Sequence, residues 1–337
     1  MRIDLILESS EPPERLVKLG RLAEDNGLGG VWVSSTLSGR DAFLSFLDVA
    51  RATDRIRMGP IAVSPYELHP LKMATSLLSL NEASNGRAQI VVGGGGVVAR
   101  RAMNLKPERR VRGVRECIEI IKQAAAGEEM QYEGELFTAK GYKPAWATKV
   151  PPVVYAGANK PQMLRMAACY ADGVMLTDKI VGQIGEVRTI IDRELERVGR
   201  NSACFRLSNF WAWHVKKTRA EAETEARINL TVRDVLSWEK NSHFMNEADM
   251  HLIEEMRPSF LAALRKRSPA YKGVPERIIR SLIDNVTSCA SADEIDKEIE
   301  RLQAFKSAGL TEIALRIYEQ PEEAIQLLGK RVVPVFT

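Results

Sequence analysis

Arg57–Gly96, RMGPIAVSPYELHPLKMATSLLSLNEASNGRAQIVVGGGG, decides the fold because it contains a complete strand–helix–strand unit. Met58–Val63 is short and mostly apolar, which is typical of a buried strand. Pro70–Ala83 carries apolar residues at helical spacing, and Gln89–Val92 again has the composition of a strand. Two strands joined by a helix in this way predict a parallel βαβ unit.

A run of glycines, Gly93–Gly96, follows the second strand of this unit directly. Such a turn places no side chain between the backbone and a molecule above it, so a flat or phosphorylated ligand can approach closely. A plain flexible turn would have the same composition, and the local sequence leaves that alternative open.

The alternation of strand and helix continues along the chain. Further strands are predicted at Ile3–Leu7, Val31–Ser34, Pro152–Ala156, Gly173–Leu176, Phe205–Val215 and Thr311–Ile317. Helical patterns separate them, including Asp41–Thr53 and Pro107–Ala126, and residues 130–150 read as a hairpin. Eight strands over this length favour an α/β fold of the (β/α)₈ TIM barrel type over an open doubly wound sheet.

We predict one domain over residues 1–337 with a helical insertion at 219–290, between the seventh and eighth strands. The stretch from Arg219 to about Asn285 shows helical patterns and no clear strand. No internal repeat or low-complexity linker argues for a second independent domain.

Composition describes an ordinary globular enzyme, with 45% hydrophobic and 27% charged residues. The net charge is +4, and basic and acidic residues are interspersed, so we expect no nucleic-acid partner. The start, MRIDLILESS, reads as a strand rather than a signal peptide, and no membrane span appears, so we expect a cytoplasmic protein. The four cysteines are scattered without a CxxC pair, so neither a disulfide framework nor a metal site is predicted.

In a barrel of this kind, ligands bind where the carboxyl ends of the strands meet the following loops. A residue at the carboxyl end of a strand is therefore a candidate whatever its type. The candidates are Glu8 and Ser9, Ser34–Thr36, Ile61–Ser64, Gly93–Gly96, Gly157–Lys160, Thr177–Lys179, His214 and Arg316–Tyr318.

Five phrases resemble the luciferase-like flavin and deazaflavin oxidoreductases, most closely their methylenetetrahydromethanopterin reductase branch. They are GLGGVWVSS, ARATDRIRMGP, HPLKMATSLLSLNEASNGRAQIVVGGGG, VYAGANKPQMLRMAACYADGVML, and the tail from AGLTEIAL to AIQLLGKRVV, in order along nearly the whole chain. The resemblance implies a barrel with a helical insertion before the last strand, usually dimeric. It also implies that FMN or the deazaflavin coenzyme F420 binds at the carboxyl ends of the strands.

The resemblance assigns cofactor-binding roles residue by residue. Ile61 and Ala62, followed by Val63, stand where the family has a non-proline cis peptide behind the ring. The turn beside the ring corresponds to Gly93, Gly94, Gly95 and Gly96, and the phosphate-side loops to Gly157, Ala158, Asn159, Lys160, Thr177 and Lys179. Helix N–H groups, a hydroxyl and a lysine suit a phosphoryl group or diester. Lys160 and Lys179 could equally be solvated surface charges.

The chain also departs from the reductase pattern. Ser35 and Thr36, which remain cofactor-binding candidates, replace an Asp-His pair, and Gly96 replaces an acidic residue. A carboxylate near the end of the first strand is displaced to Glu8. These changes remove the usual proton donors and some deazaflavin contacts, so the resemblance establishes neither the reductase reaction nor the deazaflavin.

Glu8 and His214 are the candidate catalytic residues. Glu8 is the best carboxylate at a strand end, and His214 ends the aromatic seventh strand, where it could donate a proton near neutral pH or simply cap the strand. Arg100 and Arg101 follow the glycine turn and could contact an anionic cofactor tail or belong to a solvated helix face.

We therefore predict an oxidoreductase that transfers a hydride between bound coenzyme F420 and an unidentified small organic substrate. We expect a homodimer without nucleic-acid or membrane partners. One alternative is an FMN-dependent luciferase-like monooxygenase, which would differ in its reactivity with oxygen. Another is a barrel that binds a flavin or deazaflavin without turnover.

Overall fold

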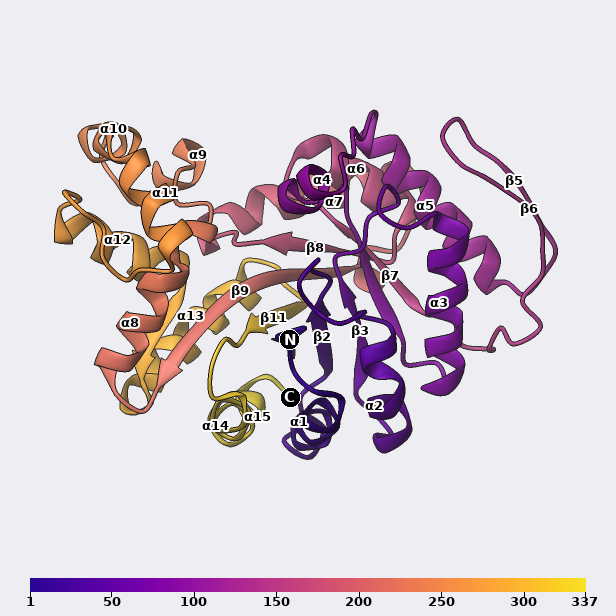
Figure 1. Cartoon of the computed structure of the whole chain (residues 1–337), viewed down its shortest axis with the longest axis horizontal. Helices are drawn as coiled ribbons and strands as arrows, with labels where there is room; N and C mark the ends of the chain where they lie inside the picture. The colour runs from indigo at the N-terminus through magenta and orange to yellow at the C-terminus, as the bar shows by residue number, and fades with distance from the viewer.

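The computed structural model describes every residue from Met1 to Thr337. Its centre is a barrel of eight parallel strands, which pair in the order β3-β2-β1-β11-β9-β8-β7-β4 (Figure 1). The bridges Met58 to Ala88 and Val63 to Val92 join β3 to β4 across the remaining seam. The barrel strands are β1 (Arg2–Leu7), β2 (Gly30–Ser34), β3 (Arg57–Ile61), β4 (Gln89–Val92), β7 (Val153–Gly157), β8 (Gly173–Thr177), β9 (Arg206–Lys216) and β11 (Glu312–Arg316). The predicted (β/α)₈ barrel is confirmed.

The seam between β3 and β4 depends on Gly59. A Cβ atom added at this position would lie 1.6 Å from the backbone oxygen of Gln89, far inside contact distance. Glycine is therefore the only residue that lets the two backbones approach this closely.

The outer helices cover the strands because each carries one apolar face. In α1 (Pro13–Asp25), Leu16, Leu19 and Ala23 are buried at helical spacing. The other helices around the barrel are α2 (Leu47–Ala52), α3 (Pro70–Ala83), α5 (Arg110–Ala125), α6 (Pro161–Tyr170), α7 (Val181–Arg197), α13 (Ile295–Ser307) and α14 (Pro321–Leu327), followed by η5 (Leu328–Val332) and α15 (Val333–Phe336). None of the helices combines the length and apolar character that crossing a bilayer requires.

Two of the predicted helices begin later than expected. Instead of one helix over Asp41–Thr53, a 3₁₀ turn η1 (Leu44–Phe46) precedes α2, because the Asp41 carboxylate accepts hydrogen bonds from the N–H groups of Phe43 and Leu44 at 2.9 Å. Instead of a helix from Pro107, a short α4 (Val97–Ala102) follows the glycine turn, and α5 begins at Arg110. Arg109 has a left-handed backbone with φ of 48°, which stops the helix from extending towards its N-terminus.

The predicted hairpin within residues 130–150 is confirmed. Its strands β5 (Met130–Glu133) and β6 (Thr138–Tyr142) pair antiparallel between α5 and β7. Figure 1 shows it projecting from the side of the barrel beside α3 and α5.

Helices α8 to α12 form a block between β9 and β10, on the opposite side of the molecule from the hairpin (Figure 1). The elements are α8 (Arg219–Asn229), η3 (Leu230–Val232), α9 (Trp238–Asn241), α10 (Glu247–Glu255), α11 (Arg257–Lys266) and α12 (Glu276–Val286). A short strand, β10 (Ser288–Ser291), ends this region and was missed, because SCAS has no strand-like alternation. It pairs with the part of β9 that extends beyond the barrel, from Trp213 to Lys216.

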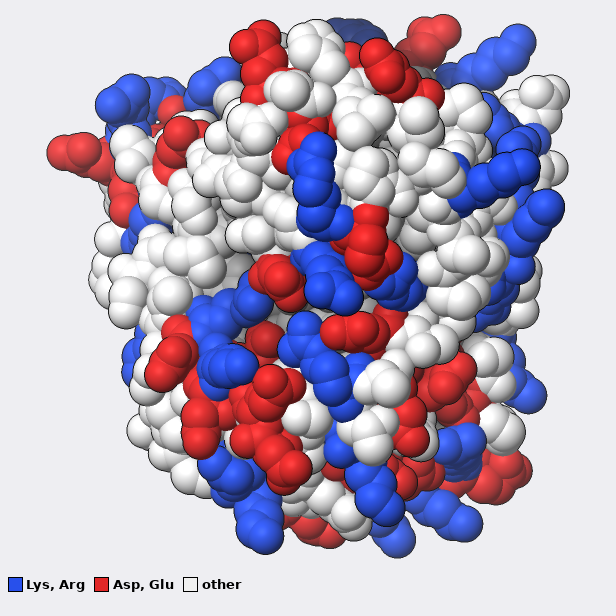
Figure 2. Space-filling model, turned by 90° about the vertical axis from the view of Figure 1, so that its left-hand side faces the viewer, with Lys and Arg blue, Asp and Glu red and all other residues white.

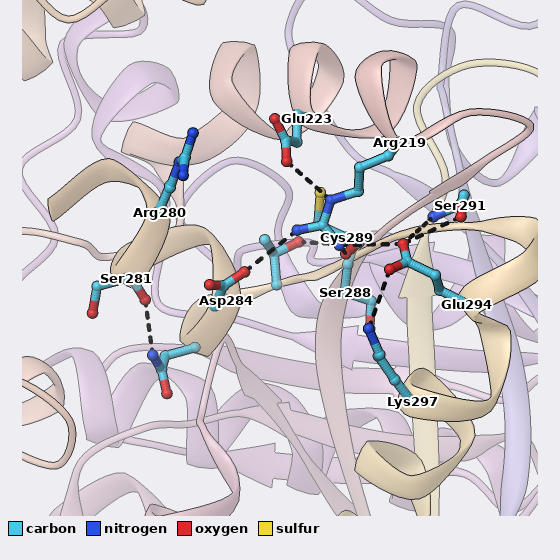
Figure 3. Close-up of polar contacts among 12 residues, drawn as sticks. Arg219, Glu223, Arg280, Ser281, Asp284, Ser288, Cys289, Ser291, Glu294 and Lys297 are labelled. Atoms are coloured by element: carbon cyan, nitrogen blue, oxygen red, sulfur yellow. Dashed lines mark hydrogen bonds and ion pairs between the residues drawn. The ribbon is translucent and has the colours of Figure 1, made fainter. Parts of the chain in front are cut away.

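Arg219 connects the first helix of this block to the elements at its end (Figure 3). Its guanidinium donates to Glu223 and to the backbone oxygen of Cys289, both at 2.9 Å, and lies 3.6 Å from Asp284 and 3.5 Å from Glu294. Contacts of one arginine with α8, α12, β10 and the turn before α13 fix the base of the block. On the outer face of this side, Figure 2 shows acidic and basic side chains intermingled rather than gathered by sign.

Buried polar side chains fill the barrel at the amino-terminal ends of its strands. Arg2 donates to Asp4 at 2.8 Å, and the Asp4 carboxylate also accepts from the Trp32 indole at 2.9 Å. The Tyr155 hydroxyl donates to Glu312 at 2.7 Å. Because these groups bond to one another and close this end, space for a ligand is left at the carboxyl ends of the strands.

Candidate functional site

A pocket of about 250 Å³ lies at the carboxyl ends of β3, β4, β7 and β8, and we call it the strand-end pocket. Its lining residues are Ala62, Val63, Ser64, Glu67, Gly93, Gly94, Gly95, Gly96, Gly157, Ala158, Asn159 and Thr177. All of them except Ser64 and Glu67 are residues to which the sequence assigned a cofactor-binding role. Their binding role stays a prediction, but the structure brings them together.

The first wall of the pocket follows β3. The peptide bond between Ile61 and Ala62 is cis, as predicted. Ile61 is buried in the barrel interior, and its backbone oxygen accepts a hydrogen bond from the Ser35 N–H at 2.8 Å. Ala62 lines the pocket. This wall is therefore a short stretch of backbone with one methyl group, which suits the face of a flat ring.

The glycine turn forms the second wall. The N–H of Gly93 donates to the backbone oxygen of Val63 at 2.9 Å, and a Cβ at Gly93 would lie 3.1 Å from that of Ala62. Gly95 has φ of 87°, a conformation that favours glycine. These contacts favour an ordered pocket wall over a plain flexible turn.

Asn159 fixes the loops on the side where a phosphoryl group is predicted. Its side-chain amide donates to the backbone oxygen of Thr177 at 3.1 Å, and its side-chain oxygen accepts from the Thr177 N–H at 3.0 Å. This double hydrogen bond holds the end of β7 against the end of β8. Because it uses only backbone groups of Thr177, the threonine hydroxyl is available to a ligand.

The two predicted phosphate-side lysines both contact Glu239 in α9. Lys160 forms an ion pair with it, and the Lys179 ammonium lies 3.5 Å from its second carboxylate oxygen. The hydrogen bond from Lys160 lowers the pKa of Glu239, with a further contribution from Lys179. Both lysines therefore lie beside the pocket without lining it, and a carboxylate stands where an anionic ligand would bind them.

A fully buried ion pair joins the helical block to the end of β8. Arg233 donates to the Asp178 carboxylate at 2.9 Å and lies 5.0 Å above the ring of Phe210. Burial lowers the pKa of Arg233, but Asp178 and Tyr318 together more than offset this effect, so the pKa is raised and the guanidinium remains charged. Asp178 follows Thr177 directly, so this pair ties the block to the rim of the strand-end pocket.

Ser35, Thr36 and Glu8 lie at the ends of β2 and β1 and do not line the strand-end pocket. The Thr36 hydroxyl is 2.9 Å from that of Ser9. Glu8 forms an ion pair with Arg316, whose guanidinium also donates to the Leu7 backbone oxygen at 2.7 Å. The Arg316 guanidinium, at the end of β11, thus neutralises the charge of the Glu8 carboxylate. The catalytic role of Glu8 stays a prediction.

His214 is fully buried on the part of β9 near the helical block and does not line the strand-end pocket. Its Nδ1 is 2.6 Å from the Glu225 carboxylate, and its ring stacks on Tyr318 with centroids 5.2 Å apart. Burial lowers the pKa of His214 despite the opposing effect of Glu225. A neutral, enclosed imidazole that joins α8 to β9 has the geometry of a structural residue, and its catalytic role stays a prediction.

Glu67 is a candidate that the sequence analysis missed. It is half-buried in the wall of the strand-end pocket, and burial raises its pKa. A carboxyl group whose pKa is raised is better suited to proton exchange with a ligand than a fully solvated one. The residue lies several positions beyond β3, in SPYELHP, and a search limited to the first residues after each strand could not find it. No three or more His, Cys, Asp or Glu side chains are grouped so as to hold a metal ion.

A (β/α)₈ barrel with a glycine-walled pocket at its strand ends belongs to the class of barrels that carry their site at the carboxyl ends of the strands. The family model described as "Luciferase-like monooxygenase" matches residues 1–312. The chain therefore belongs to the luciferase-like monooxygenase family, which confirms the resemblance found in the sequence and the expectation of an oxidoreductase.

Curated relatives include a 5,10-methylenetetrahydromethanopterin reductase of Archaeoglobus fulgidus, 27% identical over 93% of this chain and 93% of its own. An F420-dependent glucose-6-phosphate dehydrogenase of Gordonia bronchialis is 24% identical over 56% of this chain and 62% of its own. Among solved structures, the coenzyme F420-dependent tetrahydromethanopterin reductase of Methanopyrus kandleri superposes with a TM-score of 0.85 at 21% identity, covering 100% of this chain and 99% of that one. The monooxygenase RslO1 of Streptomyces bottropensis superposes with a TM-score of 0.73 at 18% identity, covering 100% of both chains. The superpositions show a shared fold.

Proposed function

We propose that this protein is a coenzyme F420-dependent oxidoreductase that transfers a hydride between the deazaflavin and a small organic substrate. The observation that carries the proposal is the strand-end pocket, walled by Ala62 and Val63 and by Gly93–Gly96. The full-length similarity to reductases, with F420 named for several relatives, favours the deazaflavin over FMN. The substrate remains unidentified, and a homodimer in the cytoplasm is our further expectation.

The residues present fit a flat ring. The pocket of about 250 Å³ is near the lower end of ligand-site volumes, about 300 Å³, so it accommodates a ring system rather than a whole coenzyme. A side chain at Gly93 would press on Ala62, whereas the glycine leaves that space to a ligand. When bound there, the deazaflavin supplies the hydride chemistry.

The protein's contribution is orientation, exclusion of water and proton transfer. Ala62 and the backbone of the glycine turn hold the two walls of the pocket at fixed positions. Asn159 fixes the loop whose Thr177 hydroxyl would bind a phosphoryl oxygen. Glu67 places a carboxyl group in the pocket wall, and burial raises its pKa, which favours proton exchange with a bound ligand over that of a fully solvated carboxylate. A hydrogen bond from the Thr177 hydroxyl to a ligand would lose less conformational entropy because Asn159 already fixes the Thr177 backbone.

Titration of the purified protein with coenzyme F420 and with FMN tests the proposal directly. We expect tight binding of F420 and weaker binding of FMN, measured by the absorbance change of each ring. Tight FMN binding without F420 binding would instead support an FMN-dependent monooxygenase, and oxygen consumption with reduced FMN would distinguish that enzyme. Bound F420 that no acceptor reoxidises faster than free F420 would support a non-catalytic binding protein.

Gly94→Asp is expected to weaken binding of either cofactor by about 100-fold or more. The new side chain would lie against Arg110, since a Cβ at Gly94 is 3.3 Å from the Arg110 Cδ, and it would put a negative charge on the wall of the strand-end pocket. Like-charge contacts with a phosphorylated ligand cost several kcal/mol. The same titrations measure the effect. Gly185→Asp adds the same charge on α7, where a Cβ meets no atom within 4 Å, and serves as the control. Unchanged affinity in Gly94→Asp would remove the glycine turn from the site.

Glu239→Gln is expected to strengthen binding of the phosphorylated cofactor by about two- to fivefold. The substitution releases Lys160 and the largely buried Lys179 from a carboxylate, and the exposed pair with Lys160 is of a kind worth roughly 0.2–1 kcal/mol. Glu255→Gln removes an exposed charge from α10 of the same block and controls for net charge. A loss of affinity in Glu239→Gln would show that the carboxylate supports the site rather than competing for it.

A further inference from the structure

The buried polar side chains at the amino-terminal ends of the strands form one hydrogen-bonded group, which we call the amino-end network. Its members are Arg2, Asp4, Gln89, Tyr155, Arg206 and Glu312. Arg57 faces this network from β3. Both Asp4 and Arg57 pair with Gly30 of β2, and residues paired in this way point to the same side of the sheet. Three arginines and two carboxylates therefore meet at this end of the barrel.

The other two arginines use both of these carboxylates. Arg2 donates to Asp4 at 2.8 Å, and Arg206 donates to Glu312 at 2.8 Å. The Glu312 carboxylate also lies 3.2 Å from Arg2. No carboxylate is left for Arg57, so the network together with Arg57 carries one uncompensated positive charge.

The surroundings of Arg57 are unfavourable for a cation. Burial lowers the pKa of its guanidinium, and the neighbouring Arg206 and Arg2 lower it further. The ordinary pKa of arginine lies so far above neutrality that the group stays charged nevertheless. A negative charge beside Arg57 would relieve the repulsion among the three guanidinium groups.

Two enclosed hydrogen-bond donors of this region have no acceptor. They are Nη1 of Arg57 and Nε2 of Gln89, and the Gln89 side chain is fully buried. The Gln89 amide lies beside Gly30, the residue that pairs with Arg57, since a Cβ at Gly30 would be 2.9 Å from Nε2. A buried donor without an acceptor is rare and costs free energy. Two such donors beside an uncompensated cation indicate an acceptor that carries negative charge.

We propose that the amino-terminal end of the barrel binds one small oxyanion, a phosphate, sulfate or carboxylate group, beside Arg57 and Arg206. Guanidinium groups bind such oxyanions through paired, charge-assisted hydrogen bonds. Arg57 is half-buried and 33% of the Arg206 side chain is exposed, so both are open to solvent on the outer side of the network. Because the two unpartnered donors are enclosed, a small anion matches the site and a large ligand does not. The site lies at the opposite end of the strands from the strand-end pocket and does not depend on the function proposed above.

Titration of the purified protein with inorganic phosphate tests the site, with ionic strength held constant by potassium chloride. Calorimetry should show saturable binding, and the Tm should rise by about 4 °C when phosphate is 100-fold above its Kd. Arg57→Gln should weaken this binding by at least about tenfold. Arg55→Gln removes an exposed arginine two positions earlier in the chain and should leave the affinity unchanged. No binding by the wild type, or equal affinities in Arg57→Gln and the wild type, would overturn the proposal.

Stability in phosphate-free buffer separates anion binding from a structural role of Arg57. Arg57→Gln removes a charge that its neighbours repel, so the variant should unfold at the wild-type temperature or above it. An arginine that supports the fold would instead lower the Tm when it is replaced. A lower Tm of Arg57→Gln in this buffer would assign the residue a structural role and contradict the proposal.

Parallel titrations with sulfate and acetate distinguish the sources of the oxyanion. Tighter binding of phosphate or sulfate than of acetate assigns a tetrahedral group, and the reverse order assigns a carboxylate. Coenzyme F420 should bind equally well to the wild type and to Arg57→Gln, because the strand-end pocket lies at the other end of the strands. Phosphate that F420 displaces completely would belong to that pocket and would refute the site at Arg57. A protein that binds phosphate through Arg57 and binds neither F420 nor FMN would contradict the proposed function alone.

Discussion

Gly59→Ala is expected to destabilise the protein by about 3 kcal/mol or more, since overpacked positions cost typically 1–3 kcal/mol and a rigid backbone neighbour leaves no room to adjust. The added Cβ would lie 1.6 Å from the Gln89 backbone oxygen, so β3 and β4 would have to separate. With unfolding entropy near 2.1 cal/mol/K per residue, a loss of this size lowers the Tm by about 4 °C. Scanning calorimetry measures it.

Gly185→Ala is the matched control for that substitution. Gly185 is an exposed residue within α7, and a Cβ there meets no atom within 4 Å. The replacement should be neutral or stabilising by up to about 1 kcal/mol, because alanine favours a helix over glycine. If Gly59→Ala unfolded at the wild-type temperature, the close approach of β3 and β4 would not be a requirement of the barrel.

The separation of β3 from β4 would also disturb the strand-end pocket, which these two strands form together. Gly93 bonds to Val63 across the same seam, and Ala62 faces Gly93 there. The defect in Gly59→Ala should therefore reduce cofactor affinity as well as stability.

The architecture was predictable because the spacing of apolar residues within a short segment indicates both the type and the length of a helix or strand. Met58–Val63, Pro70–Ala83 and Gln89–Val92 each matched an element of the structure. Helix starts were less predictable, since they depend on single backbone groups, as at Asp41 and Arg109. The strand β10 was not predictable from its own residues, because only the extension of β9 beside it makes SCAS a strand.

The candidate site was predictable where it consists of backbone, and less so where it depends on side-chain partners. The glycine turn is visible in the local sequence, and the position of the cis bond was predicted from the family resemblance. By contrast, the pairing of Lys160 and Lys179 with Glu239 joins segments about 60 to 80 positions apart, and the burial of Glu67 depends on the whole pocket. No periodicity or spacing indicates such contacts, so the charges of the site became clear only in the folded chain.

The helical block matters to the site because its residues reach the pocket rim. Glu239 contacts both phosphate-side lysines, and Arg233 contacts Asp178 beside Thr177. The block thereby influences the charge and the rigidity of the loops on which anion binding would depend.

Arg233→Leu is expected to destabilise the protein by about 3–5 kcal/mol, because it leaves the buried Asp178 carboxylate without its partner. The same variant should bind the cofactor more weakly, since the end of β8 loses its anchor to the helical block. Chemical denaturation and the F420 titration measure the two effects. Arg277→Leu breaks an exposed ion pair with Asp249 in the same block and should cost no more than about 1 kcal/mol.

The double variant Asp178→Asn/Arg233→Leu separates the charge from the packing. Asparagine tolerates the left-handed backbone of residue 178, where φ is 53°. Asp178→Asn therefore removes the unpaired charge without adding backbone strain. We expect the double variant to recover part of the stability lost in Arg233→Leu. A double variant no more stable than Arg233→Leu would mean that lost packing against Phe210, rather than the buried charge, causes the instability. The coupling energy from this cycle is therefore the direct measure of how firmly the ion pair holds the helical block to the pocket rim.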